Sequence, residues 1–176
     1  MEASSHGLEQ GRVNGVAFDM AIFTNLSRDH LDYHGTMAAY ADAKRRLFET
    51  PGLRYAVINA DDEFGRALLN TLPAGMQALS YGLAASTTPH IPHLQGMHLH
   101  FTQGLELDIV APDGTQAHLH SALLGRFNAA NLLAALGALL LMEVPLAQAV
   151  ERLTRTQTLP GRMECFGGGV GQPLVV

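Results

Sequence analysis

The sequence predicts an α/β fold: a mostly parallel sheet flanked by helices, with a small antiparallel β meander. Between residues 16 and 72, short apolar runs alternate with segments of helical periodicity. That βαβα order is typical of a parallel sheet. Further along, polar and apolar residues alternate with a period of two, which is typical of antiparallel strands with one exposed face.

The elements of the parallel part follow in order. Residues 16–23 form an apolar run and are predicted to be a strand. Thr36 is a suitable N-cap for a helix that runs to about residue 48. A second strand is predicted at residues 55–58, ending in the polar tip Asn-Ala-Asp-Asp, and a helix follows at residues 63–72.

The alternating segments at residues 97–101, 105–109 and 117–120 predict the meander. Asp113 and Gly114 supply a turn between the last two strands. Two more helices are expected at residues 128–142 and 146–154. We expect the 176 residues to form part of one domain, since a chain of this length is too short for two full ones.

Composition excludes several classes of protein. A hydrophobic content of 47% argues against disorder, and a net charge of −5 argues against a general nucleic-acid or acidic-membrane surface. The longest apolar run, residues 132–142, is shorter than the roughly 18 residues of a membrane span. Cys165 is the only cysteine, so no disulfide framework is indicated. A cytoplasmic location is expected.

The most informative stretch is FTNLSRDHLDYHG at residues 23–35, because the predicted first strand delivers it to its carboxyl end. Open α/β sheets bind ligands at that edge. His30 and His34 are either a metal-binding pair or ordinary polar histidines in a loop. Lys44 is either a solvated helix lysine or, if carbamylated, a carboxylate-like ligand that joins Glu2 and His30 around Mg²⁺.

Several blocks in order carry a resemblance to a known family: EASSHGL at residues 2–8 with Gln10 and Arg12, the stretch at 23–35, Lys44, LGRFNAAN at 124–131, and PGRME at 160–164. Together they resemble the central, ATP-binding domain of the Mur ligases, most closely the MurE branch. The resemblance covers nearly the whole chain. It implies an ATP-dependent ligase that adds a diamino acid, meso-diaminopimelate or L-lysine, to UDP-N-acetylmuramoyl-L-alanyl-D-glutamate through an acyl phosphate. This reaction belongs to peptidoglycan precursor synthesis, and hence to cell-wall growth and division.

The same resemblance implies roles for individual residues. Glu2 is similar to a Mg²⁺ ligand near the ATP phosphates, and His30 with carbamylated Lys44 resembles the pair that holds a second Mg²⁺. The positions that resemble muramoyl-dipeptide contacts are Ser4, Gln10 and Arg12. Those that resemble nucleotide contacts are Asn128, Asn131 and Arg162. Read without the family, Asn128 is equally suited to capping its helix and Arg162 to a surface ion pair.

The sequence contains no Gly-rich Lys-Ser/Thr phosphate loop. We therefore expect that the chain is an incomplete central domain, lacking the N-terminal UDP-binding domain, the phosphate loop and the C-terminal domain, and that it is inactive alone. Three alternatives stay open: a folylpolyglutamate synthase-like ligase, a metal hydrolase using His30 and His34, and a non-catalytic binding module. The oligomeric state is not indicated.

Four further histidines, His98, His100, His118 and His120, lie on the alternating strands. Residues two apart on a strand share a face, so each pair presents two rings on one side. We predict that these histidines are surface residues and not a metal site.

Overall fold

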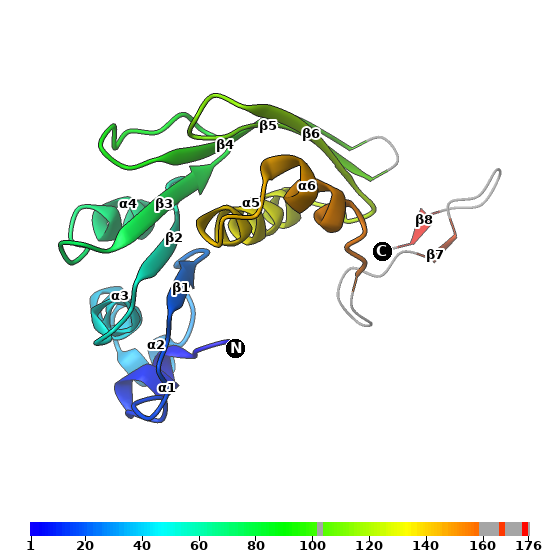
Figure 1. Cartoon of the computed structure of the whole chain (residues 1–176). Coiled ribbons are helices and arrows are strands. Elements are labelled where there is room, and N and C mark those ends of the chain that lie inside the picture. Colours follow the sequence, from blue (N-terminus) through cyan, green and yellow to red (C-terminus); the bar gives the residue numbers. More distant parts are fainter. Residues whose placement is uncertain (102–103, 159–165, 168–173, 176) are drawn as a thin grey trace.

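The computed structural model describes residues 1–101, 104–158, 166–167 and 174–175. Its main feature is a six-stranded sheet in which the strands follow one another in chain order (Figure 1). These strands are β1 (Met20–Phe23), β2 (Tyr55–Asn59), β3 (Gln77–Gly82), β4 (His93–Phe101), β5 (Leu105–Val110) and β6 (Gln116–Ser121). A separate two-stranded ladder joins β7 (Phe166–Gly167) and β8 (Leu174–Val175).

Helices lie on both sides of the six-stranded sheet. They are α1 (Ser5–Glu9), α2 (Leu31–His34), α3 (Met37–Arg45), the 3₁₀ helix η1 (Arg46–Glu49), α4 (Glu63–Leu69), α5 (Arg126–Leu141) and α6 (Leu146–Thr154). Figure 1 shows α5 and α6 on one side of the sheet and α3 and α4 on the other. The predicted α/β class with flanking helices is confirmed.

The sheet is mixed, because β4 changes its direction of pairing. Strands β1 to β4 pair in parallel, whereas β4, β5 and β6 pair antiparallel. The predicted meander therefore exists, and it extends the parallel sheet instead of forming a layer of its own. Gly114, with φ of 83°, closes the turn between β5 and β6 as the sequence predicts.

Alternate side chains of the strands pack into two separate hydrophobic cores, one on each face of the sheet. Ala56 and Ile58 point toward α4 and η1, while Val57, between them, points toward α5. Helix α5 is apolar almost all round because it is covered on one side by β1 to β4 and on another by α6. A helix in that position needs no polar face.

Several boundaries differ from the sequence prediction. The first strand begins at Met20 and not at residue 16, since residues 11–15 form turns. Strand β3 and the short helices α1 and α2 were not predicted: β3 has no run of strong β formers, and helices of four or five residues carry no period. The N-cap Thr36 is confirmed, with its Oγ1 accepting a hydrogen bond from the Ala39 N–H at 3.2 Å. Among the described residues, no helix is long and apolar enough to cross a membrane.

Candidate functional site

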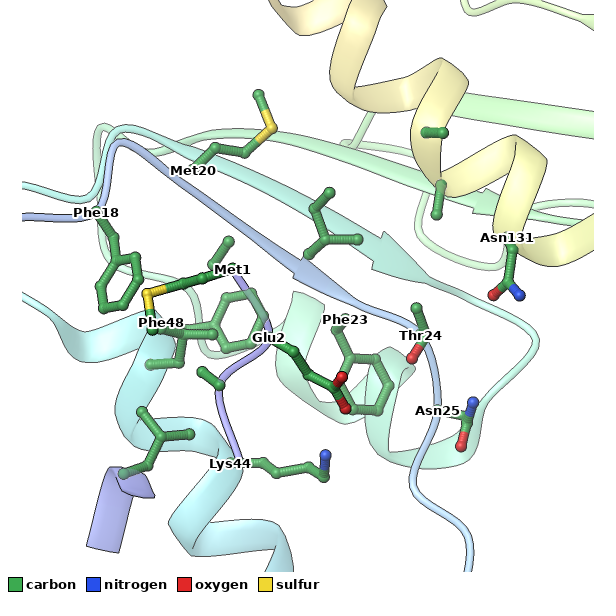
Figure 2. Close-up of a pocket in the computed structure, with 17 residues that line it drawn as sticks. Met1, Glu2, Phe18, Met20, Phe23, Thr24, Asn25, Lys44, Phe48 and Asn131 are labelled. Atoms are coloured by element: carbon green, nitrogen blue, oxygen red, sulfur yellow. The ribbon is translucent and has the colours of Figure 1, made fainter. Parts of the chain in front are cut away.

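A pocket of about 560 Å³ opens beside the first strand. Residues 1–3, β1, α3, η1 and α5 all contribute to its wall. Figure 2 shows that Phe18, Met20 and Phe48 lie at one end, whereas the Glu2 and Lys44 side chains extend toward the end where Thr24 and Asn25 lie. Asn131 of α5 closes the polar end. The pocket thus has an apolar wall at one end, and the Glu2 carboxylate and the Lys44 amine lie toward its polar end.

Hydrogen bonds from β2 and its polar tip hold the loop that follows β1. The Asn59 side chain, only 8% exposed, donates from Nδ2 to the Thr24 carbonyl at 2.7 Å. Asp62 accepts from the Leu26 N–H at 2.9 Å and, as N-cap of α4, from the Gly65 N–H at 3.0 Å. The polar ends of the first two strands therefore meet at the carboxyl edge of the sheet, as the sequence predicts for parallel neighbours.

Lys44 is the titratable group of the pocket whose protonation is most affected by its surroundings. Burial lowers the pKa of its ammonium, and the Glu2 and Asp29 carboxylates act in the opposite direction. Its Nζ lies 5.3 Å from the centre of the Tyr40 ring, one turn earlier on α3. The lowered pKa increases the fraction of neutral amine at a given pH.

His30 does not line the pocket, and Tyr40 is the side chain that contacts both His30 and Lys44. His30 precedes α2 in the left-handed conformation, with φ of 54°. Its ring meets the Tyr40 ring edge-on at 5.7 Å and the His6 ring at 5.0 Å. The Asp29 carboxylate accepts its backbone N–H at 2.8 Å. Tyr40 is therefore the side chain that His30 and Lys44 share.

His34 does not join His30 as a pair of ligands on one helical face. Its Nε2 is 2.9 Å from the Ser5 hydroxyl and its Nδ1 is 3.1 Å from the Glu9 carboxylate. Both ring nitrogens are thus engaged, which gives the metal-hydrolase alternative no support from this geometry.

Three other residues that the resemblance singles out lie just outside the two ends of α1. Ser4 is the N-cap of α1 and accepts the Gly7 N–H at 3.1 Å, Gln10 donates to the Tyr33 hydroxyl at 2.8 Å, and the Arg12 side chain is exposed. None of these three lines the pocket.

The two asparagines of α5 differ. Asn131 lines the pocket, whereas Asn128 donates from Nδ2 to the Leu124 carbonyl at 2.7 Å. The N-cap of α5 is Gly125, so Asn128 braces the preceding loop without being the cap. Arg162 lies outside the described residues.

Mg²⁺ needs more oxygen ligands than the site residues offer as they stand. Within the described part of the chain, no group of three or more His, Cys, Asp or Glu side chains is arranged to hold a metal ion. Glu2, His30 and an unmodified Lys44 offer one carboxylate and one imidazole, and Mg²⁺ prefers oxygen ligands. A carbamate on Lys44 would supply the missing oxygens, and the lowered pKa of this amine favours that modification.

The four histidines of the meander lie away from the pocket. His98 and His118 each place Nδ1 against the Asp108 carboxylate, at 2.9 and 2.8 Å. A β-bulge between Met97 and His100 brings His98 to that carboxylate.

Sequence reasoning missed four residues of this region: Thr24, Tyr40, Ser5 and Glu9. Tyr40 could have been found, because it lies four residues before Lys44 on the same helical face. Ser5 and Glu9 meet His34 only through the fold, and no spacing in the sequence indicates that contact.

Comparison with known proteins identifies the family. The model of the Mur ligase middle domain matches residues 1–139. Two relatives are each named UDP-N-acetylmuramoyl-L-alanyl-D-glutamate–2,6-diaminopimelate ligase. The one from Pseudomonas aeruginosa is 51% identical and the one from Ralstonia nicotianae 50% identical, in both cases over the whole of this chain and 35% of the relative.

Comparison with solved structures supports the same family. A ligase of the same name superposes with a TM-score of 0.81 at 40% identity, covering 94% of this chain and 34% of that one. MurF from Acinetobacter baumannii shares the fold, with a TM-score of 0.69 at 20% identity over 86% of this chain and 32% of that one. The chain spans about a third of the length of the relatives it matches. It belongs to the Mur ligase family, and residues 1–139 correspond to that family's middle domain.

Proposed function

We propose that this chain is the central, ATP-binding part of a cytoplasmic ligase that adds 2,6-diaminopimelate to UDP-N-acetylmuramoyl-L-alanyl-D-glutamate during peptidoglycan precursor synthesis. The observation that carries the proposal is the pocket in which Glu2 and Lys44 converge beside the end of β1. The names of the relatives, which are about half identical to this chain, favour diaminopimelate over L-lysine as the added amino acid.

In this proposal the substrate carboxylate takes the γ-phosphoryl group of ATP and becomes an acyl phosphate, with ADP as the leaving group. The incoming amine then attacks the acyl carbon, which forms the amide bond and releases inorganic phosphate and a proton. Glu2 would hold one Mg²⁺ ion near the phosphates, and His30 with carbamylated Lys44 would hold a second. Mg²⁺ held there would offset the negative charge that accumulates during phosphoryl transfer. Asn131, Asn128 and Arg162 are assigned to the nucleotide.

The neutral amine of Lys44 forms the carbamate by adding to CO₂: an N–C bond forms and a proton is released. Burial favours the neutral amine, and the apolar wall of the pocket limits its hydration. Ser4, Gln10 and Arg12 are assigned to the UDP-linked dipeptide. The Arg12 guanidinium suits a carboxylate because it can donate two parallel hydrogen bonds.

The test is a ligation assay with the full-length enzyme, Mg²⁺, ATP and the UDP-linked dipeptide, run in parallel with 2,6-diaminopimelate and L-lysine. Formation of ADP, phosphate and the diaminopimelate product supports the proposal. Preference for L-lysine would refute the assigned amino acid, and absence of ligation with either would refute the assigned reaction.

A further inference from the structure

A buried polar contact joins α1 to the segment that carries His30 and Lys44. His34, whose side chain is only 1% exposed, lies between Ser5 and Glu9 of α1. The Ser5 side chain is equally buried, at 1% exposure. Buried polar groups in this position are costly unless they are paired, so the contact selects one arrangement of α1 and α2.

The two ring nitrogens make different kinds of contact: Nε2 is hydrogen-bonded to Ser5, and Nδ1 is in ion-pair contact with Glu9. The Glu9 carboxylate, 3.1 Å from Nδ1, favours a proton on that nitrogen. In the neutral ring, Nε2 is then an acceptor for the Ser5 hydroxyl at 2.9 Å. Each nitrogen of His34 therefore has its own partner on α1.

The same ring stacks on the side chain that His30 and Lys44 share. The His34 and Tyr40 rings are 5.2 Å apart with an interplanar angle of 21°. Tyr40 is 5% exposed and contacts His30 on its edge and the Lys44 amine on its face. A continuous path of contacts thus leads from α1 to Lys44.

The short helices on this path need such a contact. Helices α1 and α2 have five and four residues, far below the length at which a helix is stable alone. Their positions depend on what they pack against, and α1 packs on α3. Residues 2–4, which include Glu2 and Ser4, lead directly into α1.

We propose that His34 is a positioning residue of the ligase: its contacts with Ser5 and Glu9 hold α1 in place. Because Glu2 leads into α1, the same contacts fix the position of Glu2 relative to Tyr40, His30 and Lys44. His34 touches neither substrate nor metal in this account. The inference rests on the proposed function for its catalytic consequence, but the mechanical part, the attachment of α1 to α2, stands without it.

The experiment compares variants of the full-length enzyme by two measurements, ligation kinetics with Mg²⁺ titration and amide hydrogen exchange of α1. His34→Phe keeps a ring to stack on Tyr40 but removes both polar contacts. Glu9→Gln keeps an acceptor for Nδ1, whereas Glu9→Ala and Ser5→Ala each remove one partner and leave the ring in place. His90→Gln, an exposed histidine of the β3–β4 connection, is the control.

We expect His34→Phe to lower kcat by roughly tenfold to a hundredfold, the range typical of residues that hold metal ligands in position without touching the metal. The Mg²⁺ concentration that gives half of the maximal rate should rise. Amide hydrogen exchange in α1 should be faster than in the wild type. Ser5→Ala and Glu9→Ala should show smaller effects in the same direction, and Glu9→Gln and His90→Gln should resemble the wild type.

Wild-type kcat and Mg²⁺ dependence in His34→Phe would overturn the inference, as would unchanged exchange in α1. If His34→Phe does not fold, the decision passes to Ser5→Ala and Glu9→Ala, and wild-type behaviour of both would overturn it. A wild-type enzyme without ligase activity would refute the proposed function instead, while exchange in α1 would still decide whether His34 holds that helix.

Discussion

Replacing Asp62 by alanine should destabilise the chain by an amount that the structure allows us to estimate. The carboxylate makes two bonds, one to the Gly65 N–H at the start of α4 and one to the Leu26 N–H in the loop after β1. Loss of an N-cap costs about 1 kcal/mol, and loss of a hydrogen bond to a charged group about 1.5–3 kcal/mol. We therefore expect Asp62→Ala to lower the free energy of unfolding by about 2–4 kcal/mol.

Urea denaturation at pH 7 measures this change. Asp62→Asn is the matched variant: its single side-chain oxygen can still cap α4, but its amide nitrogen cannot accept from Leu26, so it should lose about 1.5–3 kcal/mol and no more. Glu63→Ala, exposed in the first turn of the same helix, should stay within about 0.5 kcal/mol of the wild type. If Asp62→Ala also stayed within that range, the carboxylate would not hold the loop as described.

Three further outcomes are expected. Gly65→Ala places a Cβ against the Asn59 carbonyl oxygen and should lower the free energy of unfolding by about 1–3 kcal/mol in urea, whereas Gly15→Ala, in open space, should be tolerated. Arg12→Ala in the full-length enzyme should raise KM for the UDP-linked dipeptide far more than KM for ATP, and equal effects on both would contradict its assignment. Hydrogen bonds from His98 and His118 hold the pKa of Asp108 in the folded protein below its ordinary value. The Asp108 carboxylate therefore contributes its full stability above pH about 4, and this contribution is lost as the pH falls through the pKa of the folded state. Asp108→Asn should flatten that part of the pH–stability profile, and an unchanged acid profile would argue against the pairing.

The fold was largely predictable because its strongest signals are local. Residues 55–58 are apolar and end in a polar tip, and Thr36 has the residue type of an N-cap, so strand and helix follow from short segments. The mixed character of the sheet was harder to predict. It depends on the parallel pairing of β4 with β3, and β3 has the sequence QALSYG, which contains no β-branched residue.

The sequence indicated which residues belong to the candidate site, but it did not indicate how their side chains lie relative to one another. Glu2 and Lys44 are 42 positions apart, and only the fold places both on the wall of one pocket. The interpretation of His34 was harder still, because its partners Ser5 and Glu9 lie on a helix too short to carry a periodic signal. A pair of histidines four residues apart suggests a shared ligand by its spacing alone. In the structure both rings pack against Tyr40, and the ring nitrogens of His34 contact Ser5 and Glu9.

The proposed reaction depends on Lys44 acting as a carbamate in the pocket it shares with Glu2. The most direct measurement is the ligation rate of the full-length Lys44→Ala enzyme, with and without an added short-chain carboxylate. We expect near-complete loss of ligation in the variant and partial recovery with the carboxylate, which supplies the missing oxygens. Full activity of Lys44→Ala without any additive would contradict this role of Lys44.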